Sequence, residues 1–309
     1  MKIVILDSLT LGAVNLKIFE DFGELKIYPT TSQEQILERC KDAEVIITCK
    51  VRFERETLQS LPQTKLIALT STGMDIIDLD CARELGIEVK NVVAYSTNAV
   101  AQHTLALTLS LMANLSYYDS YCKGGGWCQS PIFTCITENL FEIEGKEWGI
   151  IGFGNIGKQV AKLAQAFGAK VSYSSTSGKN SDSDYPKKSL ESLLQTSDIV
   201  SIHAPLNPQT YHLLNQTKLS LLKEKSILIN VGRGGIIDEE ALAERMLKSK
   251  IKFGSDVLEN EPMKTNHPLL HPDLKDRLLL TPHTAWAYQE TRERLIQKVY
   301  ENVKIFLQK

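Results

Sequence analysis

This 309-residue chain lacks both a charge imbalance and a long apolar segment, and each absence is informative. Lysine and arginine number 35 against 37 aspartate and glutamate residues, which gives a formal charge of −2. A nearly neutral chain offers no electrostatic reason to bind nucleic acid or an anionic membrane. No apolar run approaches the roughly 20 residues that a membrane-spanning helix needs. Small molecules are therefore the expected ligands.

Metal-ligand spacing and a targeting signal are absent as well. No CxxC pair or zinc-type spacing occurs among the cysteines, which are Cys40, Cys49, Cys81, Cys122, Cys128 and Cys135. The N-terminus runs directly into a strand-like apolar stretch, without the charged, apolar and small-residue succession of a signal peptide. We therefore expect a cytosolic protein with free thiols and no metal site.

A glycine-rich turn between a strand pattern and a helix pattern is the strongest local signal. The apolar residues 148–151 are followed by the sequence GFGNIG at residues 152–157, and then by apolar residues on one helical face. This context is the one in which a GxGxxG motif binds a dinucleotide. Gly152 permits the tight turn, Gly154 lets backbone approach a pyrophosphate, and Gly157 lets helix and strand pack closely. The stretch predicts a nucleotide-binding βαβ unit.

Strand and helix patterns alternate along most of the chain. Strands are expected at residues 2–6, 25–28, 44–48, 66–70, 87–90, 148–151, 170–173, 198–203, 226–231, 251–256 and 277–281. This alternation favours an α/β fold with two doubly wound parallel sheets and a ligand-binding cleft between the domains. We predict a substrate-binding domain at 1–98 plus 283–309 and a dinucleotide-binding Rossmann domain at 99–282.

Charged side chains follow three of the later strands, where open α/β sheets present ligand-binding residues. Arg233 lies between glycines, Glu261 precedes a proline and His283 follows one. Each alone has an ordinary explanation, as a surface arginine, a solvated acid or a structural histidine. Together they supply a cation for a carboxylate, an acid for a forming hydroxyl and a carboxylate that keeps the acid protonated. Reduction of a 2-oxo acid needs these three groups.

These motifs, in this order, resemble the D-isomer-specific 2-hydroxyacid dehydrogenases over essentially the whole chain. The segments that carry the resemblance are residues 71–80, 98–103, 152–157, 203–206, 230–235, 256–262 and 281–286. The chain is most similar to the glycerate or hydroxypyruvate dehydrogenase branch. The resemblance implies hydride transfer between a nicotinamide cofactor and a small 2-oxo or D-2-hydroxy acid, such as hydroxypyruvate, glycerate or glyoxylate. It also implies a homodimer, in which Trp127 is expected to reach the neighbouring subunit.

The resemblance also implies roles for individual residues. Arg233 would orient the substrate, His283 would be the general acid/base, and Glu261 would pair with that histidine. The substrate-binding positions are Lys50, Val51, Thr72, Gly73, Met74, Arg233, His283 and Trp286. The cofactor-binding positions are Gly152, Gly154, Asn155, Ile156, Gly157, Ser175, His203, Pro205, Val231, Gly232 and Asp256. For Trp286, packing at the domain junction is an equal alternative.

Ser175 departs from the pattern of the family, whose members commonly carry an aspartate there that bonds the ribose hydroxyls of NAD. Without that carboxylate a 2′-phosphate meets no like-charge repulsion, and hydroxyls together with Lys179 could bind it. The choice between NAD and NADP is therefore open.

Other functions are alternatives on the same fold. A formate dehydrogenase typically has glutamine at the position of Glu261, which argues against it. A dinucleotide-sensing binding protein, as in the C-terminal-binding corepressors, is compatible with all the motifs. Lactate or 3-phosphoglycerate are alternative substrates, although we expect no regulatory domain of the kind that the allosteric phosphoglycerate dehydrogenases carry.

Overall fold

The computed structural model describes residues 1–137 and 140–308 and consists of two compact units. The first comprises Met1–Ser96 and Ala287–Lys309, and the second comprises Thr97–Trp286. Residues 283–286 lie with the second unit, whereas the sequence placed the boundary before His283. The reason is that the Asp256 carboxylate accepts the backbone N–H groups of Thr284 and Ala285, each at 2.8 Å. Within the described residues, no helix combines the length and the apolar character needed to cross a membrane.

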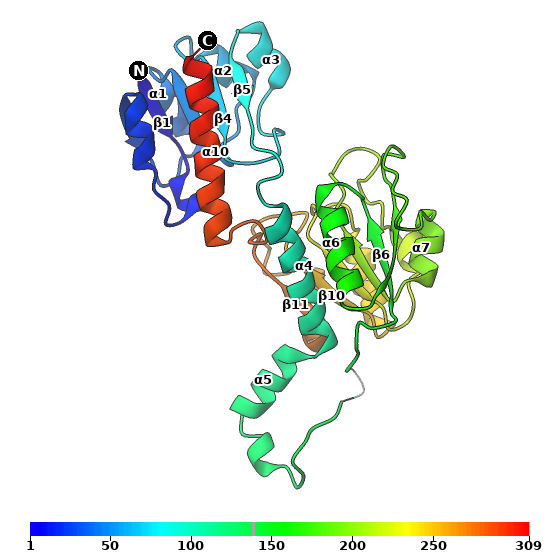
Figure 1. Ribbon diagram of the computed structural model, residues 1–309. Coiled ribbons are helices and arrows are strands. Elements are labelled where there is room, and N and C mark those ends of the chain that lie inside the picture. Colours follow the sequence, from blue (N-terminus) through cyan, green and yellow to red (C-terminus); the bar gives the residue numbers. More distant parts are fainter. Residues whose placement is uncertain (138–139, 309) are drawn as a thin grey trace. The chain divides into compact units, whose positions relative to one another are not determined.

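The first unit is built on a five-stranded sheet in the order β2-β1-β3-β4-β5, with all neighbours parallel. Its strands are β1 (Lys2–Ile5), β2 (Glu24–Ile27), β3 (Val45–Thr48), β4 (Leu66–Leu69) and β5 (Glu88–Lys90). Its helices are η1 (Ser8–Leu11), η2 (Lys17–Phe22), η3 (Gln33–Gln35), α1 (Ile36–Cys40), α2 (Arg55–Gln59), α3 (Leu79–Glu84) and α10 (Gln289–Leu307). The strands β3 and β4 are buried along their whole length, as expected of parallel strands covered on both faces. The C-terminal helix α10 lies along this sheet (Figure 1).

The second unit contains a six-stranded parallel sheet in the order β11-β10-β9-β8-β6-β7. Its strands are β6 (Glu147–Ile151), β7 (Lys170–Ser174), β8 (Ile199–Ile202), β9 (Ile227–Asn230), β10 (Lys252–Ser255) and β11 (Leu278–Leu280). A parallel bridge between Tyr173 and Lys187 continues the sheet beyond β7. The chain reverses its direction of winding between β6 and β8, which is where sheets of this kind bind nucleotides.

Helices flank this second sheet and extend from it. They are α4 (Thr97–Met112), α5 (Leu115–Lys123), η4 (Trp127–Gln129), α6 (Asn155–Ala166), α7 (Leu190–Thr196), α8 (Gln216–Leu219), α9 (Glu239–Leu247), η5 (Pro268–Leu270) and η6 (Pro272–Arg277). The helix α5 and the segment after it lead away from the sheet of this unit (Figure 1). Residues 116–122, which form most of α5, were not assigned to an element from the sequence, because α5 buries none of its side chains and so shows no apolar face.

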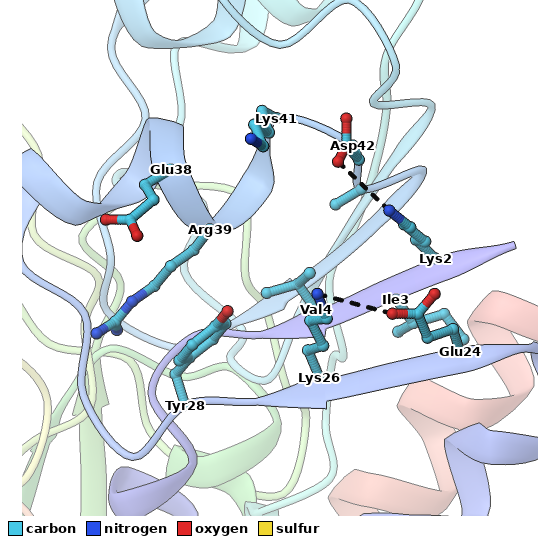
Figure 2. A pocket seen from close by; sticks show the side chains of 11 residues that line it. Lys2, Ile3, Val4, Glu24, Lys26, Tyr28, Glu38, Arg39, Lys41 and Asp42 are labelled. Carbon is cyan, nitrogen blue, oxygen red and sulfur yellow. Dashed lines mark hydrogen bonds and ion pairs between the residues drawn. The ribbon is translucent and has the colours of Figure 1, made fainter.

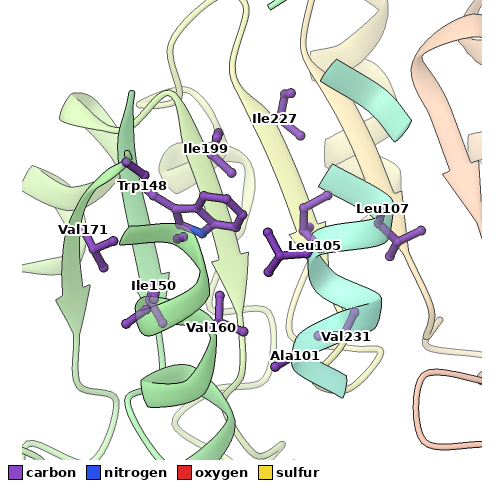
Figure 3. Close-up of a cluster of buried hydrophobic side chains, with 14 of the residues drawn as sticks. Ala101, Leu105, Leu107, Trp148, Ile150, Val160, Val171, Ile199, Ile227 and Val231 are labelled. Atoms are coloured by element: carbon purple, nitrogen blue, oxygen red, sulfur yellow. The ribbon is translucent and has the colours of Figure 1, made fainter. Parts of the chain in front are cut away.

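The core of the second unit is organised around Trp148 on β6. Figure 3 shows its indole between the sheet and α4, near Leu105 and Ile199. Trp148 is fully buried, and its Nε1 donates a hydrogen bond to Ser201 Oγ at 2.9 Å. The helix α4 contributes ten buried residues to this unit, which accounts for the apolar character of most of its surface.

Candidate active site

The glycine turn after β6 has the geometry that a dinucleotide requires. Gly152 has φ +89°, and a Cβ on it would lie 2.7 Å from the backbone nitrogen of Ala204. A Cβ on Gly157 would collide with the carbonyl oxygen of Gly152, so helix and strand can approach only at a glycine. Around Gly154, by contrast, no atom of the described residues other than those of its chain neighbours lies within 4 Å of the Cβ position. The first turn of α6, at Asn155 and Ile156, therefore presents free N–H groups to open space, which suits a pyrophosphate.

Ser175 lies directly after β7 and borders a cavity of about 550 Å³. The cavity is lined by Ser174, Ser175, Thr176, Lys187, Lys188, Ser189, Leu190, Gln209 and Leu213. No acidic side chain is among these lining residues. The Ser175 hydroxyl is buried and has no hydrogen-bond partner within residues 1–137 and 140–308. Lys179, the cation expected from the sequence, does not line the cavity; Lys187 and Lys188 do, because the bridge to Tyr173 brings them beside β7.

His203 and Pro205 follow β8, beside the glycine turn. The imidazole Nε2 of His203 lies 3.0 Å from Ser201 Oγ, and the Nδ1 atom is buried without a partner in the described part of the chain. Burial lowers the pKa of His203 to about 3, so this ring is neutral at physiological pH. The Pro205 carbonyl accepts a 2.7 Å hydrogen bond from Thr210 Oγ1, which fixes the turn.

The loop after β9 carries Val231, Gly232 and Arg233. The buried Asn230 side chain holds it, since its Nδ2 donates to the Arg233 carbonyl at 2.9 Å and its Oδ1 accepts Gly232 N–H at 3.1 Å. The Arg233 guanidinium is exposed and donates to the Gly232 carbonyl at 2.9 Å. It forms no ion pair with any described residue, so its remaining N–H groups are available to a substrate carboxylate.

Glu261 and His283, for which the sequence predicts roles as an acid/base pair, are in contact. The Nδ1 atom of His283 lies 2.7 Å from Glu261 Oε2, and the other carboxylate oxygen accepts Leu258 N–H at 3.1 Å. Because an ionised carboxylate only accepts hydrogen bonds, Nδ1 carries the shared hydrogen and Nε2 is left for another partner. His283 also has φ +55°, a left-handed backbone conformation that is uncommon outside glycine.

Asp256 holds the loop that carries His283. Its carboxylate is 2% exposed and accepts Thr281 Oγ1 at 2.5 Å, in addition to the two N–H groups that follow His283. Its own carbonyl accepts His283 N–H at 2.8 Å. The helix α4 joins this network, because His103 Nε2 lies 2.9 Å from Thr281 Oγ1. The histidine is thus fixed from both sides, a role for Asp256 beyond the cofactor contact expected from the sequence.

The first unit presents the remaining expected residues on two adjacent turns. Lys50 follows β3 and residues 72–74 follow β4, at the same edge of the sheet. Thr72 is fixed by a 2.8 Å hydrogen bond from its hydroxyl to the Val92 carbonyl. Met74 is partly buried, and Val51 is only 5% exposed and packs into the core.

Asp7, which sequence reasoning missed, organises the turn at Lys50. Its carboxylate accepts the backbone N–H groups of Cys49 and Lys50, at 2.9 and 2.6 Å. Burial raises the pKa of Asp7, and these hydrogen bonds oppose that effect. An acid two residues after the end of the buried strand β1 was the available signal in the sequence.

Two further features are Trp286, whose expected contact with the substrate stays a prediction, and a small hollow in the first unit. Trp286 is partly buried and packs against the core of the second unit. A hollow of about 60 Å³ in the first unit lies over β1 and β2, and two of its three lysines are paired with acids, Lys2 with Asp42 and Lys26 with Glu24 (Figure 2). Among the described residues, no group of three or more His, Cys, Asp or Glu side chains could hold a metal ion.

Comparison with known proteins places this arrangement in a family. A family model described as D-isomer specific 2-hydroxyacid dehydrogenase, NAD binding domain, matches residues 105–285. A hydroxypyruvate reductase from Blautia hydrogenotrophica is 33% identical over 317 residues, which cover 99% of this chain and 97% of the relative. A glycerate dehydrogenase from Methylorubrum extorquens is 35% identical over 308 residues, covering 99% and 96%.

A solved structure agrees with these relatives. The structure of D-lactate dehydrogenase from Aquifex aeolicus, complexed with NAD and lactic acid, superposes with a TM-score of 0.86 and 29% identity. It covers 100% of this chain, which in turn covers 96% of that structure. With the family model matched over more than half of its length, and relatives above 30% identity along nearly all of it, the chain belongs to the D-isomer-specific 2-hydroxyacid dehydrogenase family.

Proposed function

We propose that the protein is a nicotinamide-dependent oxidoreductase that interconverts small 2-oxo acids and D-2-hydroxy acids, with hydroxypyruvate and glyoxylate as the preferred oxidised substrates. The observation that carries the proposal is the 2.7 Å contact between His283 Nδ1 and Glu261 Oε2, in the same unit as the glycine turn and Arg233. The hydroxypyruvate reductase and glycerate dehydrogenase relatives support the choice of substrates.

The chain's own residues account for the proton and for the substrate charge. Glu261 stabilises the protonated imidazole of His283, whose Nε2–H donates to the oxygen on C2 of the 2-oxo acid. Arg233 binds the substrate carboxylate through its exposed guanidinium. When bound, the nicotinamide ring supplies the hydride. For Lys50, Thr72 and Gly73 of the first unit, a role in substrate binding stays a prediction.

The cavity at Ser175 favours NADP over NAD. Its lining combines two serine hydroxyls at the end of β7, the Thr176 hydroxyl and two lysines, with no acid among the described lining residues. Lys187 Nζ has only a 3.3 Å contact with the Gly178 carbonyl, so its charge is not neutralised by a carboxylate within the described chain. A 2′-phosphate there would give the buried Ser175 hydroxyl a partner. We therefore propose that NADPH binds more tightly than NADH.

We also propose a homodimer, formed through the segment that leads away from the second sheet. Several apolar side chains of this segment are exposed to solvent: Leu115 is 55% exposed, Trp127 54%, Ile132 61%, Phe133 88% and Ile136 80%. Grouped exposed apolar side chains mark interaction surfaces in soluble proteins. Cys122 and Cys128 are exposed free thiols in the same segment, which supports the cytosol as the compartment where they stay reduced.

The test is a panel of hydroxypyruvate, glyoxylate, pyruvate and 3-phosphohydroxypyruvate, each assayed with NADH and with NADPH. We expect turnover of the first two, and loss of turnover in His283→Ala with cofactor affinity retained. His271→Ala is the matched control, since that histidine is about half exposed and lies beside Asp273 rather than Glu261. Cofactor binding without turnover of any 2-oxo acid would instead favour the dinucleotide sensor, and wild-type turnover by His283→Ala would overturn the catalytic assignment.

A further inference from the structure

The segment Leu258–Glu259 contacts the loops that carry Arg233 and Glu261, and Glu261 links it to His283. A Cβ on Gly234 would collide with the Leu258 carbonyl and the Glu259 nitrogen, so the residue after Arg233 packs directly against this peptide. The Leu258 N–H donates to Glu261 Oε1 at 3.1 Å, and the second oxygen of Glu261 contacts His283. A shift of this peptide would therefore move the arginine relative to the acid/base pair.

A buried pair, Glu239 and His267, holds the peptide in place. Glu239 is the first residue of α9 and is 8% exposed. Its Oε1 accepts Glu259 N–H at 2.9 Å, and its Oε2 lies 2.8 Å from His267 Nε2. The ring nitrogen His267 Nδ1 accepts Leu269 N–H at 3.3 Å, so Nε2 carries a hydrogen and donates to Glu239. Two donors thus converge on one carboxylate, one oxygen for each.

The start of helix α9 does not by itself require this arrangement. Asp238 already caps the helix, since its carboxylate accepts Ala241 N–H at 3.0 Å. Glu240, the next residue, supplies a negative charge to the first turn and is exposed, as such acids ordinarily are. Burying the carboxylate of Glu239 has a desolvation cost that its two hydrogen bonds offset. The burial is therefore explained by the peptide and the histidine that Glu239 holds.

We propose that Glu239 and His267 are positioning residues, which fix the Leu258–Glu259 peptide and through it the placement of Arg233 against Glu261 and His283. The proposal rests on the proposed function, because its main effect is read in turnover. It adds two residues to the machinery that act through the Leu258–Glu259 peptide rather than on the substrate.

The decisive variant is Glu239→Gln, which keeps the shape of the side chain but offers one acceptor oxygen to two donors. We expect kcat/KM for the 2-oxo acid to fall between about 10-fold and 100-fold, the scale associated with small misplacement of catalytic groups. The dissociation constant of NADPH, measured by fluorescence, should change less than about twofold, because the glycine turn is not involved. Glu240→Gln removes the same charge from the same helical turn and should leave all these quantities unchanged.

A double-variant cycle separates the pair from general loss of structure. If Glu239 and His267 act as a unit, the double variant Glu239→Gln with His267→Ala should be no less active than the less active of the two single variants. If the losses of the two single variants multiply in the double variant, the proposal is overturned. An equal fall in kcat/KM and in cofactor affinity would also overturn it. Wild-type-like kinetics in Glu239→Gln would overturn it too.

Amide hydrogen exchange tests the positioning role independently of the proposed function. The amides of residues 258–261 should exchange faster in Glu239→Gln than in the wild type or in Glu240→Gln. A wild-type protein that reduces no 2-oxo acid would contradict the proposed function. Unchanged exchange at residues 258–261 would contradict the positioning role, whatever the activity.

Discussion

Replacing Ser175 with aspartate should reverse the cofactor preference of this protein. The side chain at this position follows β7 and borders the cavity of about 550 Å³, where its hydroxyl is buried without a partner in the described residues. An aspartate would bring a negative charge to the place proposed for the 2′-phosphate. It would also bring the acceptor that commonly bonds the ribose hydroxyls of NAD.

The size of the effect follows from the charges. Two unit charges about 4 Å apart repel by about 1 kcal/mol in water and about 4 kcal/mol at an effective dielectric constant of 20. The cavity opens to solvent and a phosphate monoester carries a charge of about −1.5 to −2, so we expect about 2–3 kcal/mol. At about 1.4 kcal/mol for each factor of ten, NADPH affinity should fall by about 30-fold to 140-fold.

The assay is titration of NADPH and NADH against the wild type and Ser175→Asp, followed by nucleotide fluorescence without substrate. NADH affinity should stay the same or rise in the variant. Lys187→Ala should weaken NADPH binding in the same direction, whereas Lys179→Ala, which removes a lysine outside the cavity, should change it little. Equal losses of both nucleotides in Ser175→Asp would refute the reasoning, because they would indicate damage to the loop rather than charge repulsion.

The remaining predictions concern assembly and stability. Phe133→Asp combined with Ile136→Asp should convert the proposed dimer to a monomer in light scattering, since these side chains are 88% and 80% exposed; an unchanged mass would exclude this surface. Trp148→Ala should lower the free energy of unfolding by about 3–5 kcal/mol, measured with denaturant, because the fully buried indole leaves a cavity. The pKa of His203 is lowered from 6.5 to about 3, so the unfolded chain binds more protons in this range. Stability should therefore fall on acidification below about 6.5, and the fall should be smaller in His203→Gln; parallel pH curves would contradict the burial of a neutral ring.

The fold followed from local patterns that report burial directly. Apolar runs such as residues 45–48 are parallel strands because both faces of the sheet are covered. The glycine turn could be predicted equally well, since the φ of +89° at Gly152 and the tight packing at Gly157 allow no other residue. The helix α5 was not predicted, because it buries no side chain and its sequence therefore shows no helical periodicity of apolar residues. The sequence suggested Lys179 as the cation near Ser175, because it is close along the chain. In the structure, the bridge to Tyr173 brings Lys187 to the cavity instead.

The sequence by itself determined which chemical groups are present and the strand ends on which they lie, because backbone conformation and burial are local demands on residue type. Only the tertiary structure decided which groups meet. The pairing of His283 with Glu261 spans 22 residues, and the hold of Glu239 on Glu259 spans 20. Asp7 reaches Cys49 and Lys50 across 42 and 43 positions. Such contacts depend on strand order and loop packing, which no local pattern specifies.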